Sequence, residues 1–167
     1  MSTAVQATIE SAITECSAHK RWLQRNRSLL QGVFPLSPQA TGRLDERTVE
    51  LLDQLIYRFT KLQDSMARRL VPALYRFIEG ETEPTAFLDM LNRLEALGVL
   101  TSAHQWQTFR ALRNNLAHDY PESRDQTAVT LNQLHADLPD FLSLFDHLAA
   151  DYQRRLDQTP GTKPEAP

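Results

Sequence analysis

Apolar residues recur at intervals of three and four along most of the chain, which is the spacing of helices with one buried face. The first such stretch starts near Thr3 and reaches Leu30. Gly32, Pro35 and Pro38 follow it and should end the helix. The pattern therefore predicts a long first helix followed by a proline-containing loop.

Two more helices are expected in the middle of the chain. Asp45 is a suitable N-cap for the second, whose apolar positions keep the helical spacing as far as Leu70. Pro72 should kink or break that helix. The third should start near residues 82–83 and end at Gly98, because glycine favours helix C-termini.

The last two helices carry capping signals of their own. Ser102 should cap the fourth, which Pro121 closes, and Ser123 should cap the fifth. The fifth reaches Tyr152 and should be kinked near Pro139. Long helices joined by short connections predict an all-α fold, an antiparallel bundle of about five helices.

Length and composition predict one domain with a tail. The chain has 167 residues and only five glycines, which suits a single helical domain. We expect residues 1–156 to form this domain and the proline-rich residues 157–167 to be a flexible tail. The loop of residues 32–42 carries enough apolar side chains to pack against the core.

A formal net charge of −3 gives the chain no overall attraction to nucleic acid, so any such contact needs a local basic patch. The run HKRWLQRNR, residues 19–27, is one candidate. It has two interpretations: a surface that contacts an RNA backbone, or a solvated face whose cations suit a helix C-terminus.

Several other classes of protein find no support. The single cysteine, Cys16, excludes an internal disulfide and a multi-cysteine zinc site. No signal peptide or apolar run of about 18 residues is present. His104, His135 and His147 lack the spacing of a helical metal pair. We therefore expect a cytoplasmic protein with no metal, no cofactor and no membrane partner.

The stretch RNNLAHDYP, residues 113–121, places several reactive side chains at the end of the expected fourth helix. Arg113 falls on its apolar face, close to the line of Trp106. A guanidinium among apolar side chains is costly unless an anion pairs with it. We therefore expect a specific partner for Arg113 or a second surface that covers it.

Arg113 and His118 suit the cleavage of a phosphodiester. The guanidinium can hold phosphate oxygens, the imidazole can move a proton, and the 2′-hydroxyl of RNA can be the nucleophile. The two positions lie about 140° apart on a straight helix. They can meet one substrate only if the helix end unwinds or a second copy supplies its own motif. A purely structural role at the helix end is the alternative.

The pattern R-N-x-x-x-H-x-Y, formed by Arg113, Asn114, His118 and Tyr120, resembles the signature of the HEPN superfamily, and most closely its HepT toxin branch. The resemblance spans roughly residues 3–155 and includes a tryptophan and LRN ahead of AHDY. It implies a two-fold homodimer that acts as a metal-independent endoribonuclease, with both motifs lining a shared cleft.

The resemblance also implies a role for each residue. Arg113 and His118 would be catalytic, and Asn114 would support the site. Tyr120 would be the residue to which an MntA-type nucleotidyltransferase antitoxin transfers AMP, adding bulk and negative charge that silence the toxin. The alternatives are a non-catalytic HEPN subunit that binds a minimal nucleotidyltransferase, and a helical interaction protein without catalysis.

Overall fold

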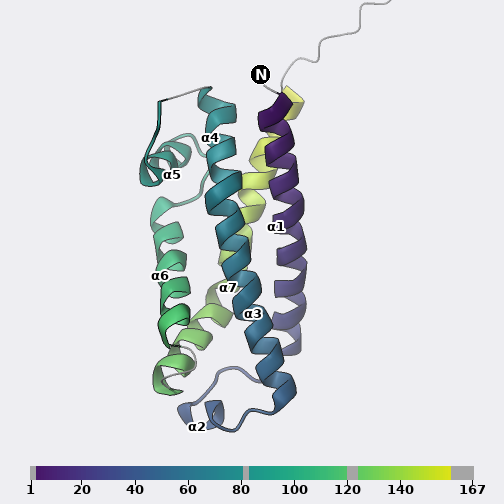
Figure 1. The fold of residues 1–167 in the computed structure, drawn as a ribbon, viewed down its shortest axis with the longest axis vertical. Coiled ribbons are helices and arrows are strands. Elements are labelled where there is room, and N and C mark those ends of the chain that lie inside the picture. Colours follow the sequence, from purple (N-terminus) through teal and green to yellow (C-terminus); the bar gives the residue numbers. More distant parts are fainter. Residues whose placement is uncertain (1–2, 81–82, 120–123, 159–167) are drawn as a thin grey trace, which may run out of the picture.

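The computed structural model shows an all-α protein (Figure 1). It describes residues 3–80, 83–119 and 124–158, and these contain no strand. Consecutive long helices lie side by side and alternate in direction (Figure 1). The elements are α1 (Thr3–Leu29), α2 (Pro38–Thr41), α3 (Glu46–Ser65), the π-helical segment η1 (Met66–Leu70), α4 (Val71–Glu79), α5 (Phe87–Ala96), α6 (Ala103–Asp119) and α7 (Arg124–Gln158).

Three of the expected helix-end signals have the predicted role. The carboxylate of Asp45 accepts a hydrogen bond from the Thr48 amide at 2.8 Å, at the start of α3. The hydroxyl of Ser102 accepts one from the Gln105 amide at 3.1 Å, at the start of α6. Gly98 follows α5 with a φ of 70°, a conformation that glycine adopts without strain.

Two expected helix boundaries, a break at Pro72 and a third helix that starts near residues 82–83, differ from the structure. The chain stays helical through Pro72, because the wider turn of η1 directly precedes it and the Val71 amide donates to the Met66 carbonyl. The third helix begins at Phe87 and not at residues 82–83. Pro84 disfavours a helical conformation for the residue before it, which delays the start of α5.

The loop after α1 packs against α7, as its apolar residues predict. Leu36 is buried, and the Asn132 side chain holds both its amide and its carbonyl, at 2.7 and 2.9 Å. The same loop contains the short helix α2, which the hydrophobic pattern does not predict. Ser37 caps α2 by accepting a hydrogen bond from the Ala40 amide at 3.1 Å.

Pro139 lies inside α7 and does not end it. Proline has no amide hydrogen, so the carbonyl of His135, one turn earlier, loses its helical donor. The Nε of Arg27 in α1 donates to this oxygen at 3.1 Å. A side chain from another helix therefore replaces the hydrogen bond that Pro139 removes.

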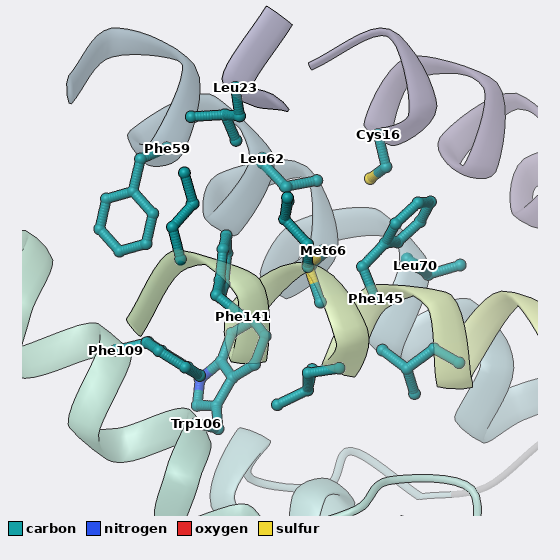
Figure 2. Close-up of a cluster of buried hydrophobic side chains, with 14 of the residues drawn as sticks. Cys16, Leu23, Phe59, Leu62, Met66, Leu70, Trp106, Phe109, Phe141 and Phe145 are labelled. Carbon is teal, nitrogen blue, oxygen red and sulfur yellow. The ribbon is translucent and has the colours of Figure 1, made fainter. Parts of the chain in front are cut away.

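The core fills the space between α1, the α3–η1–α4 rod, α6 and α7. Figure 2 shows aromatic side chains from three of these elements gathered together: Phe59, Trp106, Phe109 and Phe141. The Phe141 ring centroid lies 4.8 Å from that of Phe59 and 5.0 Å from that of Phe109, both in edge-to-face orientation. This cluster fixes the position of α6, the helix that carries the candidate motif.

The end of α7 passes the expected domain boundary. The helix includes Asp157 and Gln158, while residues 159–167 of the expected tail lie outside the described residues. Across the part of the chain that the structure describes, every helix is too short or too polar to span a bilayer.

Candidate functional site

The helix α6 carries Arg113, Asn114 and His118 on one unbroken run. Asn114 is exposed, and for His118 only the backbone is described. Tyr120 lies outside the described residues. Because α6 remains helical through Asp119, it does not unwind between the Arg113 and His118 positions. Those positions therefore face directions about 140° apart on α6.

Arg113 has the specific partner that its place on an apolar face predicts. Its Nη2 donates to Oδ1 of Asp64 in α3 at 3.2 Å. Both side chains keep about a third of their surface exposed, 34% and 31%. Among the described residues, one oxygen of one carboxylate thus holds the guanidinium, which still reaches solvent.

Asp64 is a site residue that sequence analysis missed. It lies with Gln63 and Ser65 between Leu62 and Met66, whose spacing of four keeps the apolar stripe of α3. The hydrophobic pattern therefore gives no signal that marks Asp64. Its partner lies on another helix, which no spacing within α3 indicates.

A pocket of about 370 Å³ lies beside the Arg113–Asp64 pair. Its walls come from α3, η1, α5 and α6, and the lining residues are Gln63, Asp64, Ala67, Phe87, Trp106, Arg110 and Arg113. Two arginines face one carboxylate in this set, so the local formal charge is positive. The pocket combines the Phe87 and Trp106 rings, whose planes are 57° apart, with cations that can hold an anionic group.

Gln63 adds an unusual feature to the pocket wall. The residue is only 3% exposed, and its Nε2 has no hydrogen-bond partner among the described residues. A buried amide left unpaired costs about 1–3 kcal/mol. The side chains around Arg113 are therefore not fully satisfied by the protein itself.

The basic run of residues 19–27 divides between two roles. Lys20 binds Asp146 of α7 at 2.5 Å, and Arg27 binds the His135 carbonyl of the same helix at 3.1 Å. These two cations tie α1 to α7. The remaining cations of the run do not bind α7, and Arg25 lies over a ring of its own helix.

Two histidines of α7, outside the motif, have structural contacts. His135 stacks on Phe34, with ring centroids 4.1 Å apart, and Nε2 of His147 contacts the Gly98 carbonyl at 2.9 Å. Within residues 3–80, 83–119 and 124–158, no group of three or more histidine, cysteine or carboxylate side chains could hold a metal ion. The His135 contact joins α7 to the loop after α1, and the His147 contact joins α7 to the loop between α5 and α6.

The contact of His135 makes stability depend on pH. Burial and, secondarily, the Arg27 guanidinium lower the pKa of His135 from its ordinary value of 6.5. The folded protein therefore binds this proton less readily than the unfolded chain does. The stability contribution is complete above pH 6.5 and is lost as the pH falls below that value.

As the pH is lowered from 6.5 to about 5, the free energy of unfolding should fall less for His135→Phe than for the wild type. The reason is that phenylalanine keeps the stack on Phe34 and takes up no proton. Urea unfolding at several pH values measures this. His19, whose pKa is also lowered by burial and then by Arg58, titrates in both proteins and cancels in the comparison. Parallel pH profiles for the two proteins would contradict the assignment.

Comparisons with known proteins do not assign the chain to a family. Neither protein-family models, nor curated proteins, nor solved structures gave a match. The functional argument therefore depends on the motif of α6 and on what surrounds it.

Proposed function

We propose that this chain is a metal-independent endoribonuclease of the HepT branch of the HEPN superfamily, and the cytoplasmic toxin of a type VII-like toxin–antitoxin pair. The observation that carries the proposal is the setting of Arg113. Its guanidinium lies on the apolar face of α6, is held in place by Asp64, and lines a positively charged pocket. An arginine in such a place is suited to receive a phosphate.

The proposed reaction is an attack by the 2′-hydroxyl of RNA on the adjacent phosphorus. The 2′-oxygen gives up its proton and bonds to phosphorus, and the bond from phosphorus to the 5′-oxygen breaks. The 5′-oxygen takes up a proton, which leaves a 2′,3′-cyclic phosphate. His118 would move these protons, Arg113 would stabilise the charge on the phosphate oxygens, and Asn114 would support the site.

The unbroken course of α6 favours a two-fold homodimer as the active form. Within one copy, the positions of Arg113 and His118 face directions about 140° apart on α6. A single motif therefore does not readily bring both residues to one phosphate. A second motif related by two-fold symmetry would supply His118 opposite the Arg113 of its partner. It would also provide two imidazoles, one to remove a proton and one to donate a proton.

Cleavage of a total cellular RNA pool in the presence of a chelator tests the activity directly. The wild type should cut and leave 2′,3′-cyclic phosphate ends, whereas His118→Ala should not cut, because it lacks the proton-transfer group. Sedimentation and circular dichroism should show that both proteins fold and associate alike. Equal cutting by the two proteins would reject the assignment of His118.

Tyr120 is the proposed acceptor of AMP from an MntA-like nucleotidyltransferase antitoxin. Incubation with that partner and ATP should raise the mass of the wild type by one or more AMP groups and abolish cleavage, because the added phosphate repels RNA. Tyr120→Phe should stay unmodified and active. Modification that persists in Tyr120→Phe would point to another acceptor.

The second candidate is a non-catalytic HEPN subunit that binds a minimal nucleotidyltransferase. The pairing of Arg113 with Asp64 favours it, because a carboxylate already neutralises the guanidinium. A folded wild type that cuts no RNA yet changes the nucleotide chemistry of its partner would support this alternative.

A further inference from the structure

Two exposed aromatic rings and three cations form a strip across α1 and α3. The strip, named here the aromatic–cation strip, consists of Trp22, Arg25, Tyr57, Arg58 and Lys61. The guanidinium carbons of Arg25 and Arg58 lie 5.3 and 5.4 Å from the Trp22 ring centroid. Arg58 also lies 5.5 Å from the Tyr57 ring centroid, and the Lys61 ammonium lies 5.7 Å from it.

This concentration of contacts is local. Energetically significant cation–π pairs occur about once per 70–80 residues in proteins. The Trp22 and Tyr57 rings together make four cation–ring contacts. The rings are also accessible, since Trp22 is 38% and Tyr57 is 53% exposed. Solvent-accessible aromatic side chains beside cations are the groups on which single-strand binders stack bases.

The cations of the strip are not neutralised by carboxylates. Arg25, Arg58 and Lys61 form no ion pair with a described residue, although cations such as Lys20 and Arg69 do. The Nε of Arg58 is buried without a hydrogen-bond partner among the described residues. The strip therefore presents three cations without an ion-pair partner among the described residues, on a chain whose formal net charge is −3.

The titratable group in contact with Arg58 does not supply negative charge. Nδ1 of His19 lies 3.2 Å from Nη1 of Arg58, and burial together with this guanidinium lowers the pKa of His19. Glu15, one turn before His19, is already bonded to Ser65 and Arg69.

The strip leads toward the candidate site along α3. Tyr57, Lys61 and Asp64 are spaced by four and three residues, so they share one stripe of the helix. Asp64 ends this stripe and holds Arg113. A polymer lying on the strip would therefore reach Arg113 within two turns of α3.

We propose that the aromatic–cation strip binds single-stranded RNA that extends from the phosphate at Arg113, an inference that rests on the proposed function. The cations would hold phosphates while bases stack on the Trp22 and Tyr57 rings, the combination that single-strand binders use. A second copy of the chain suits the strip less well, because a two-fold contact centred on it would oppose the cations of the two strips.

Binding of a single-stranded 2′-O-methyl RNA, which cannot be cleaved, tests this inference over a range of salt concentrations. Tyr57→Ala should weaken binding roughly 5- to 150-fold, the usual loss for one stacked base. The double variant Arg25→Gln, Lys61→Gln should also reduce the slope of log affinity against log salt by about 1.4, which is about 0.7 for each cation on a single strand.

The matched control is the double variant Arg47→Gln, Arg76→Gln, which makes the same change in net charge at exposed positions outside the strip. It should leave the affinity and the slope unchanged. Cleavage of a dinucleotide, too short to reach the strip, should be equal in the wild type and in the strip variants.

The outcomes separate the inference from the proposed function. RNA binding that depends on the strip, in a protein that cuts no RNA, would support the strip and reject the ribonuclease. If the wild type cleaves RNA and the strip variants keep its RNA affinity and its salt slope, the ribonuclease is supported and the strip is rejected. Equal losses in strip and control variants, or a loss of self-association without a loss of RNA affinity, would overturn the inference.

Discussion

Arg113→Ala should slow RNA cleavage by about 100- to 1000-fold, the usual cost of removing one donor that stabilises transition-state charge. The fold should survive the change. The Arg113–Asp64 pair is about one-third exposed, and exposed pairs contribute at most about 1 kcal/mol. Initial rates on a single-stranded RNA, with thermal unfolding of the same samples, measure the two effects separately.

Two further variants sharpen the result. Arg113→Lys keeps the charge near Asp64 but loses the planar pair of donors, so it should recover only a small part of the rate. Arg47→Ala removes an exposed arginine at the opposite end of α3 and should keep the full rate. A wild-type rate in Arg113→Ala would restrict Arg113 to a structural partner of Asp64.

Phe141→Ala should lower the free energy of unfolding by about 3–5 kcal/mol. Phe141 is fully buried, and its ring contacts Phe59 of α3 and Phe109 of α6 edge to face. Removing the ring leaves a cavity where α3, α6 and α7 meet. Urea unfolding at a fixed protein concentration measures the loss.

The controls for this prediction lie on the same helix. Phe141→Leu keeps most of the buried carbon and should cost roughly 1–2 kcal/mol. Val129→Ala changes a side chain that is 65% exposed and should stay within about 0.5 kcal/mol of the wild type. A loss of less than about 1 kcal/mol in Phe141→Ala would show that the aromatic cluster does not hold α6 and α7 together.

The helices and several of their ends are predictable because their causes are local. Asp45 and Ser102 cap the amides three residues after them, and Gly98 adopts a backbone conformation that other residues disfavour. The apolar spacing likewise indicates which side of α6 is buried. Each of these signals lies within one turn of the element that it determines.

The treatment of prolines is not predictable in the same way. Pro72 is tolerated because η1 widens the preceding turn, and Pro139 is tolerated because Arg27 of α1 satisfies the carbonyl that it leaves free. The rule that proline breaks or kinks a helix considers only the helix that contains the proline. The compensating donor for Pro139 comes from a helix that is distant in sequence.

By itself the sequence determined the all-helical class, the apolar faces and the need of Arg113 for an anionic partner, because helical periodicity and desolvation act on each segment alone. Only the tertiary structure decided that the partner is Asp64, that Gln63 and Arg110 share its pocket, and that Trp22 lies beside Arg58. These pairs join helices whose relative rotation depends on the packing of the whole core. No spacing within one segment can encode that rotation.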